Sequence, residues 1–279
     1  MKTKIGLLGL VMSFLFVGCS KDDQTDTPMT ADDLTVNAYM DEMSDDVSKI
    51  ALDQYTRAST SLGKTAELMA FLPDCATVSF SDTQDTWVRT IDFDAKGCVM
   101  KNGNTLKGKI TISGSNNYQQ SIYSINCSFD NFYHNGNLIQ GGYTIVRSIK
   151  STPNLQSDHP VLEMNADLKV TTVNGVIRNI TTTRIREMVD GLDTPTTWMD
   201  DVYLISGNQS ITSPKGTMSS AITTPLKLSM NCNHIVEGVI EFTKKNNKTA
   251  TLDYGDGACD KTATCTINGV VKTIVLGNN

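Results

Sequence analysis

The chain has 279 residues, of which 39% are hydrophobic and 19% are charged, and its formal charge is -6. This composition excludes a disordered chain and a protein with many membrane spans, and it predicts a soluble globular body with a sizeable core. An acidic surface argues against nucleic acid or anionic lipid headgroups as partners.

The N-terminal segment, residues 1–18, has the pattern of a secretory signal. Lys2 and Lys4 supply positive charge, and Ile5 to Val17 is an apolar run too short to span a bilayer as a helix. The run ends at Gly18-Cys19, which resembles a bacterial lipoprotein lipobox and predicts that the Cys19 thiol is acylated. The alternative is an ordinary signal peptide followed by a chance cysteine. Removal of both lysines would take the charge from -6 to -8.

Residues 19–30 are rich in Asp, Thr and Ser and predict a flexible tether. The start of this segment, Ser20 to Asp23, resembles the surface-export tether of Bacteroidota lipoproteins. Two or three acyl chains give stable anchoring, whereas a single chain is marginal. We therefore expect a mature protein held at the outer membrane of a cell envelope by lipid, on its periplasmic or its surface side.

An amphipathic helix is predicted from about Asp32 to Thr56. Its apolar residues recur at three- and four-residue steps; they are Val36, Tyr39, Met40, Met43, Val47, Ile50 and Ala51. Its polar face is acidic, which argues against adsorption to a membrane and favours packing of the apolar stripe on a β body. The polar residues are Asp41, Glu42, Asp45 and Asp46. A short second helix is predicted from Lys64 to Phe71.

From Cys75 onward the sequence predicts β structure, because runs rich in Thr, Val, Ile, Ser and Tyr are separated by Gly and Asn residues typical of turns. Glycines precede β-prone runs at intervals of about two strands and two turns; they are Gly108, Gly141, Gly175, Gly207, Gly238 and Gly269. The fold class predicted is mainly β: a long antiparallel meander of about ten to twelve strands forming a curved sheet, a sandwich or a partly open barrel. Residues 31–279 are expected to form a single domain.

Two stretches resemble each other. Thr90 to Cys98 and Thr251 to Cys259 share Thr, an aliphatic residue, Asp, an aromatic residue and Cys in the same order. Each has a cysteine upstream, which predicts two related halves at about 75–150 and 200–279. The equivalent disulfides are Cys75–Cys98 and Cys232–Cys259, which leaves Cys127–Cys265 as the third pair. The absence of closely spaced cysteines argues against zinc.

No catalytic motif stands out, so an enzyme is the less favoured class and no cofactor is expected. The three histidines belong to no metal or triad pattern, and the chain has no nucleophile elbow, P-loop or dinucleotide fingerprint. The densest carboxylate cluster is a weak candidate for Ca²⁺; it comprises Asp253, Asp256 and Asp260, with Asp92 and Asp94 at the corresponding place upstream. The favoured interpretation is a solvated hairpin turn.

The richest local aromatic group is Phe129, Phe132, Tyr133 and His134. Rings of this kind could stack on a glycan. Their position in an alternating strand that runs into Asn135-Gly136 favours strand core and hairpin edge.

The segments from Trp87 to Ile112 and from Leu252 to Gly269 resemble a large group of uncharacterised Bacteroidota lipoproteins. Recurrent features of that group are I-D-F-x-x-x-C-like and D-Y-G-x-G-x-C-D segments, the second followed by an Asn-Gly hairpin. The resemblance implies an envelope location and a β fold, and it implies no activity.

Three functions follow as hypotheses. The first is a non-enzymatic envelope lipoprotein whose β body binds a glycan, another envelope protein or a host surface. The second is a LolA-like carrier, in which a curved sheet and a covering helix enclose lipid or another apolar ligand. The third is an enzyme.

Overall fold

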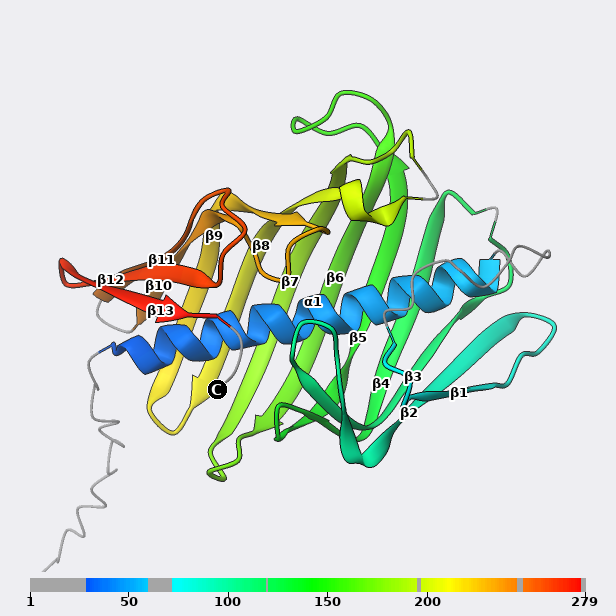
Figure 1. Ribbon diagram of the computed structural model, residues 1–279, viewed down its shortest axis with the longest axis horizontal. Coiled ribbons are helices and arrows are strands. Elements are labelled where there is room, and N and C mark those ends of the chain that lie inside the picture. The colour runs from blue at the N-terminus through cyan, green and yellow to red at the C-terminus, as the bar shows by residue number, and fades with distance from the viewer. Residues whose placement is uncertain (1–28, 60–71, 119, 195–196, 245–247, 277–279) are drawn as a thin grey trace, which may run out of the picture.

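The computed structural model of the protein describes residues 29–59, 72–118, 120–194, 197–244 and 248–276. The predicted signal segment, Cys19, most of the tether and the predicted second helix lie outside these residues. The described chain forms one antiparallel sheet of thirteen strands, in which every strand pairs with its neighbours in sequence, and one long helix (Figure 1).

The elements follow each other in this order: α1 (Ala31–Ser59), β1 (Thr77–Phe80), β2 (Thr86–Val99), β3 (Thr105–Ser115), β4 (Ile122–His134), β5 (Asn137–Lys150), β6 (His159–Thr171), β7 (Ile177–Asp190), the single 3-10 turn η1 (Trp198–Asp200), β8 (Val202–Ser213), β9 (Gly216–Ser229), β10 (Glu237–Lys244), β11 (Lys248–Asp256), β12 (Thr262–Ile267) and β13 (Val270–Val275).

The predicted fold class is confirmed, and of its three architectures the curved open sheet is the one formed. The sheet curls across its strands, so that β1–β3 and β10–β13 rise on either side of α1, which lies across the strands on the concave face (Figure 1). Strand order is strictly sequential and the sheet is not closed, so it is neither a sandwich nor a barrel. Among the described residues, no helix is both long enough and apolar enough to cross a membrane.

Helix α1 begins with a capping box. The backbone amide of Asp33 donates to the Thr30 hydroxyl at 3.4 Å, and the Thr30 amide donates to the Asp33 carboxylate at 2.9 Å. The helix has 29 residues, which corresponds to a length of about 43 Å. It therefore extends along most of the trough formed by the sheet.

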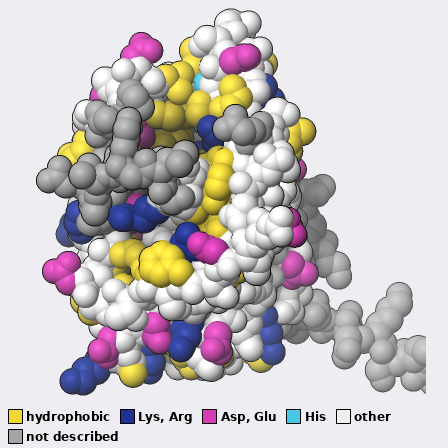
Figure 2. Space-filling model, turned by 90° about the vertical axis from the view of Figure 1, so that its right-hand side faces the viewer, with side chains coloured by type: hydrophobic (Ala, Val, Ile, Leu, Met, Phe, Trp, Pro, Cys, Tyr) yellow, Lys and Arg dark blue, Asp and Glu magenta, His cyan; other side chains and the backbone are white. Residues whose placement is uncertain are grey.

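The apolar stripe of α1 packs on the sheet, but the rest of the helix is not solvated. Every side chain from Asp33 to Ser59 is at least partly buried, and the acidic side chains Asp41 and Asp46 are among the most buried polar groups. Figure 2 faces the side of the molecule where α1 ends, and hydrophobic side chains gather there between the walls of the sheet, with charged side chains among them. The simple amphipathic interpretation is therefore wrong for the polar face, because the sheet encloses the helix from both sides.

The two similar stretches of sequence, which begin at Thr90 in β2 and Thr251 in β11, bury the same two positions. In β2 these are Ile91 and Phe93, and in β11 they are Leu252 and Tyr254. Each of these strands pairs with the strand that precedes it in the chain, β1 and β10 respectively. The matching residues therefore have matching environments.

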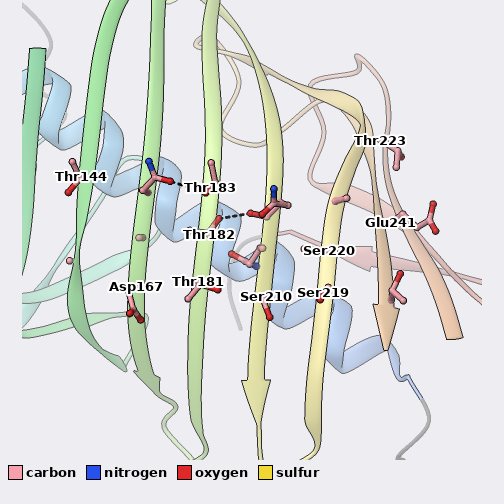
Figure 3. A pocket seen from close by; sticks show the side chains of 17 residues that line it. Thr144, Asp167, Thr181, Thr182, Thr183, Ser210, Ser219, Ser220, Thr223 and Glu241 are labelled. Atoms are coloured by element: carbon pink, nitrogen blue, oxygen red, sulfur yellow. Dashed lines mark hydrogen bonds between the residues drawn. The ribbon is translucent and has the colours of Figure 1, made fainter. Parts of the chain in front are cut away.

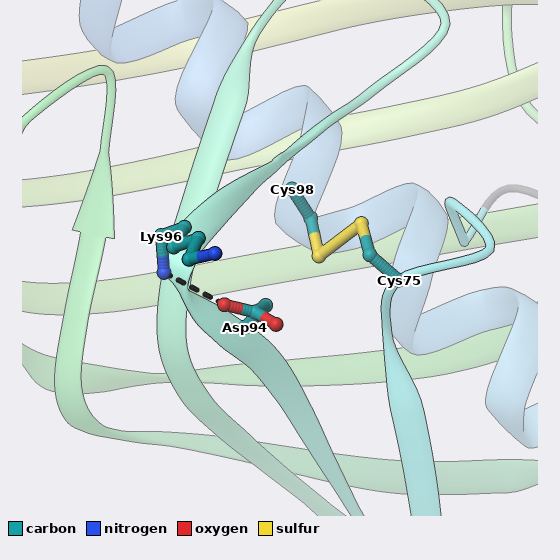
Figure 4. The surroundings of a disulfide bond; sticks show 4 residues. All are labelled: Cys75, Asp94, Lys96 and Cys98. Carbon is teal, nitrogen blue, oxygen red and sulfur yellow. Dashed lines mark hydrogen bonds between the residues drawn. A yellow bond between two sulfur atoms is a disulfide. The ribbon is translucent and has the colours of Figure 1, made fainter.

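The predicted disulfides Cys75–Cys98 (Figure 4) and Cys232–Cys259 are formed, with Cα atoms 5.9 and 5.5 Å apart. The predicted pair Cys127–Cys265 is wrong, because both thiols are free and buried. Cys127 belongs to β4 and Cys265 to β12, and β5 to β11 lie between them in the sheet. Each thiol instead fills space in the core as a small hydrophobic side chain.

Gly108 allows the sheet to bend beside β4. Its φ is +86°, and a Cβ at this position would lie 1.9 Å from the carbonyl oxygen of Asn131. The register between β3 and β4 shifts between Lys107 and Lys109, which marks a bulge. Bulges increase local twist and bend a strand, so this glycine contributes to the curl that encloses α1.

Replacement of Gly108 tests this role. We expect Gly108→Ala to lower the free energy of unfolding by about 3 kcal/mol or more, because both the backbone dihedral and the neighbouring strand must change. Gly175→Ala is the matched control, since Gly175 also has positive φ but a Cβ there would meet nothing within 4 Å; a loss of about 1 kcal/mol is expected for it. Urea unfolding measures both, and equal losses would contradict the close-approach argument.

Candidate functional site

The concave face of the sheet holds α1 through buried ion pairs. Asp41 accepts from Arg184 of β7 at 2.8 Å, and Asp45 accepts from Arg186 at 2.9 Å. Further pairs along the helix join Asp46 to His134 at 2.9 Å, Glu42 to His234 at 3.0 Å and Asp33 to Lys244 at 2.9 Å. The acidic face of the helix is thus matched by basic side chains from β4, β7, β10 and the β9–β10 loop.

Burial and ion pairing shift the pKa of these buried carboxyl groups in opposite directions. Burial raises the pKa of Asp41 above its ordinary value, although the adjacent Arg184 guanidinium favours the ionised carboxylate. At Asp33 burial also acts to raise the pKa, but the hydrogen bonds from Lys244 and Thr30 outweigh it and lower the pKa overall. Paired charges of this kind hold the helix in one position along the trough.

Two small cavities lie beside α1 on the inner face of the described sheet. Among the described residues, a cavity of ≈30 Å³ lies between α1 and β6–β9, beside Asp41 and Arg184. A second cavity, of ≈100 Å³, lies beside Asp46, Met100 and Met230. Drug-sized ligands occupy several hundred Å³. Neither cavity is large enough to hold a lipid while α1 is in place.

A hollow larger than either of these two cavities lies on the opposite, outer face of the sheet. It is an open trough of ≈970 Å³ across the middle of β5 to β10 (Figure 3). Side chains on this face alternate with those that contact α1; for example, Thr183 lies between Thr182 and Arg184, both buried on the inner side. We call this hollow the outer trough.

Cross-strand pairing arranges the outer trough as two parallel rows of short side chains. One row follows the paired positions Thr144, Asn165, Thr183, Asn208, Ala221 and Glu241. The adjacent row follows Gly142, Asp167, Thr181, Ser210, Ser219 and Thr243. Because all of these residues except Glu241 have short side chains or none, the floor of the trough is low and consists mainly of hydroxyl and amide groups.

Some of these groups are paired with each other and others are available. The Thr183 hydroxyl donates to the side-chain amide oxygen of Asn165 at 2.8 Å, and the hydroxyl of the inner-face residue Thr182 donates to the Asn208 backbone carbonyl at 3.2 Å (Figure 3). Thr181, Ser210 and Ser219 make no side-chain hydrogen bond to another residue in the described part of the chain. Their hydroxyls can donate to or accept from a bound ligand.

The charge of the outer trough is low and negative. Asp167 and Glu241 are its two ionisable residues, and its lining includes no Lys, Arg or aromatic side chain. An anionic ligand would meet carboxylates and no counter-charge, so the electrostatics favour a neutral ligand.

A backbone irregularity shapes the outer trough at β8. Gly207 has φ +129°, and a Cβ there would lie 2.1 Å from the carbonyl oxygen of Thr183. The β8–β9 register shifts between Ile205 and Asn208 at the same place. The bulge bends β8 and leaves the surface beside Asn208 without a large side chain.

Two carboxylates of the candidate calcium cluster accept hydrogen bonds within local turns. Asp253 accepts from the Gly255 amide at 2.9 Å, and Asp260 accepts from the amide and the hydroxyl of Thr262, both at 2.8 Å. These hydrogen bonds hold the pKa of Asp260 below its ordinary value. Asp256, at the end of β11, is exposed and lies opposite Glu237. Among the residues that the structure describes, no three His, Cys, Asp or Glu side chains gather as a metal site.

The upstream aspartates behave in the same way. Asp94 accepts from the Lys96 amide at 2.8 Å close to the Cys75–Cys98 disulfide (Figure 4), and Asp92 pairs with Lys109 at 3.0 Å. Both carboxylates therefore have local structural partners.

The aromatic group of β4 belongs to the core and the hairpin edge. Phe132 and His134 are fully buried, Phe129 stacks on Phe132, and Tyr133 lies under the Lys107 ammonium group. The outer trough was not predicted from the sequence. Its only sequence signal is the density of Thr, Ser and Asn at alternate positions of β5 to β9.

Comparisons of the chain with protein-family models, with curated proteins and with solved structures found no match. The likeness to Bacteroidota lipoproteins therefore stays a prediction. Function can be inferred only from the chemistry of the molecule's own surfaces.

The ion pairs of α1 can be tested by removal of one or both partners. We expect Arg184→Met to lower the free energy of unfolding by about 3 kcal/mol, because Asp41 is left as an unpaired buried carboxylate. The loss should shrink as the pH falls from 8 to 5. Without the Arg184 guanidinium, the folded-state pKa of Asp41 is raised further above its unfolded value. Proton uptake by Asp41 therefore stabilises the folded state of the variant at the lower pH.

The double variant Asp41→Leu/Arg184→Met removes both charges and is expected to recover most of the loss. Lys109→Met is the surface control and should leave the free energy of unfolding nearly unchanged, since its partner Asp92 is about half exposed. Urea unfolding at the two pH values measures all four proteins. A double variant as unstable as Arg184→Met would contradict the pairing argument.

Proposed function

We propose that this protein is a non-enzymatic lipoprotein of the cell envelope, anchored through acylated Cys19, and that its outer trough binds a neutral, hydroxyl-rich glycan. The observation that carries the proposal is the double row of Thr, Ser and Asn side chains across β5 to β10. Lipid anchoring is inferred from the sequence pattern at Gly18-Cys19.

The size of the outer trough suits an extended ligand. Six strands at about 4.8 Å spacing give a length of roughly 24 Å across the sheet, and the volume of ≈970 Å³ is at the upper end of ordinary ligand pockets. The repeat of polar groups along this length matches a chain of sugar units better than a compact small molecule.

The chemistry of the outer trough favours sugars over other polar ligands. Hydroxyls and amides both donate and accept, as sugar hydroxyls do, so the pairing needs no charge. A neutral hydrogen bond contributes only about 1 kcal/mol net. Because no aromatic ring lines the trough, affinity must accumulate from several weak hydrogen bonds. An oligosaccharide should therefore bind more tightly than its monosaccharide.

Substitution within the outer trough tests the ligand. We expect Thr181→Val/Thr183→Val to weaken binding of a neutral oligosaccharide by roughly tenfold, because two hydroxyls are lost while the shape and β propensity of the side chains are kept. Isothermal titration calorimetry against neutral and anionic oligosaccharides measures the effect. The matched control is Thr217→Val, an exposed β9 residue outside the trough. Equal affinity of parent and trough variant, or preference for anionic sugars, would overturn the assignment.

The lipid anchor is tested separately. Mass spectrometry of the N-terminal peptide from protein made in a bacterium with a lipoprotein pathway should show an acylated Cys19. We expect Cys19→Ala to lack the acyl groups, because the acylated thiol is absent. A mature N-terminus at another residue, with unmodified Cys19, would show an ordinary signal peptide.

A further inference from the structure

The two ends of the sheet differ in charge. One end of the sheet holds the connections that follow the odd-numbered strands, from β1–β2 to β11–β12. These connections contain one lysine, Lys261, and seven acidic residues: Asp82, Asp85, Asp158, Asp193, Asp200, Asp201 and Asp260. The connections at the other end are short and contain no Asp or Glu in the sequence. Exposed lysines lie in or beside them, including Lys101, Lys169, Lys215 and Lys272. The connections at this end therefore carry net positive charge, and we call it the basic end.

Two hairpins at this basic end expose aliphatic side chains at their tips. In the β6–β7 hairpin Val173 is 70% exposed, with Val176 and Ile177 beside it, and in the β12–β13 hairpin Val270 is 70% and Val271 65% exposed. These five are among eleven large hydrophobic side chains exposed in the described residues. Exposed apolar side chains combined with lysines are typical of a surface that contacts anionic lipid.

The start of α1 lies at the same side of the molecule. Asp33 of the first turn pairs with Lys244 at the end of β10, and its charge also acts on Arg178 at the start of β7. Figure 1 shows the β6–β7, β8–β9 and β12–β13 turns around the blue end of α1. The chain that joins α1 to Cys19 therefore leaves from the middle of this region.

The length of that chain limits the distance to the membrane. Residues 19–28 precede the buried Met29 and can extend at most about 35 Å when fully stretched. An anchored Cys19 thus keeps the hairpin tips close to the bilayer, where even weak contacts are favoured by the high effective concentration.

We propose that the basic end of the sheet, with Val173, Val176 and Ile177 of one hairpin and Val270 and Val271 of the other, rests on a bilayer that contains anionic phospholipid. The step in which the tether holds this end close to the membrane rests on the proposed acylation of Cys19. The contact fixes which face of the protein is turned away from the membrane: the acidic loops lie farthest from it, and the outer trough runs parallel to it.

The hairpins suit this contact because their backbones are already paired. Asn268 and Gly269 have φ of 51° and 78°, as a tight type I′ turn requires. In the other hairpin the Thr172 amide donates to the Val176 carbonyl at 3.0 Å, and the Val173 amide donates to the Asn137 side chain at 3.2 Å. The tips can enter the headgroup region without leaving these backbone groups unpaired.

Vesicle flotation of the chain from Ser20 to Asn279 tests the proposal without the acyl anchor. This chain contains every described residue and so retains the whole fold. We expect it to float with vesicles of phosphatidylcholine and phosphatidylglycerol, to stay unbound with phosphatidylcholine alone, and to lose binding as salt is raised. Val173→Ser/Val270→Ser/Val271→Ser should reduce binding by about tenfold or more.

The matched control is Ile122→Ser/Ile149→Ser, which removes two exposed aliphatic side chains from the acidic end and should bind as the parent does. A dye on Asn174→Cys should respond to the anionic vesicles, and the same dye on Asn117→Cys at the acidic end should not. Equal flotation of the tip variant and the parent would overturn the proposal. Dimerisation without flotation, abolished by the tip variant, would overturn it in favour of a second copy of the chain.

These outcomes are separate from those of the anchor experiment. An acylated Cys19 with no flotation of the Ser20 chain leaves the anchor in place and overturns the lipid contact. Flotation of the Ser20 chain without acylation of Cys19 supports the contact and removes the anchor.

Discussion

The structure depends on the enclosure of one helix by one sheet. A sheet of thirteen strands has more apolar surface on its concave face than it can hide by itself, and α1 covers that face along about 43 Å. Every described side chain of the helix from Asp33 onward is in turn at least partly buried, so its buried carboxylates need partners in the sheet. Arg184, Arg186 and Lys244 supply them. Hydrophobic burial holds the two layers together, and the ion pairs set where along the trough the helix lies.

This enclosure leaves the outer face of the sheet without a covering element. The two cavities described beside α1 are small because the helix packs directly on the concave face of the sheet. The outer face has to remain soluble without any covering element, and Thr and Ser combine a polar group with good β propensity. A ladder such as Asn165, Thr183 and Asn208 is therefore stable as a sheet surface and also offers hydrogen-bonding groups in a regular array.

The sequence predicts the parts of the fold that local pattern controls. Residue periodicity places the helix within a few residues of its observed ends, Ala31 and Ser59, and the doubled motif identifies both disulfides. Pairing by elimination fails for Cys127 and Cys265, because a cysteine can also be a buried apolar residue without a disulfide partner. The roles of Asp41 and Arg184 could not be predicted, since their pairing joins residues 143 positions apart.

The same limitation applies to the outer trough. Alternation of Thr and Ser predicts a strand with one polar face, but it does not say which residues of neighbouring strands lie side by side. A one-residue change of register would replace Thr181 and Thr183 on the outer face by Thr182 and Arg184. The observed register is fixed from the inside, because Arg184 must meet Asp41. The position of the outer hydroxyls is therefore determined by the packing of the helix.

The backbone irregularities connect the two faces further. Gly207 lies in β8 between the outer Asn208 and the inner Ile205, and its bulge both bends the strand and opens the surface beside it. A strand that curved less around α1 would also present a flatter outer face. One backbone geometry thus produces both the curvature that buries the helix and the hollow that could hold a ligand. For this reason the stability of the inner layer and the shape of the outer trough should not vary independently.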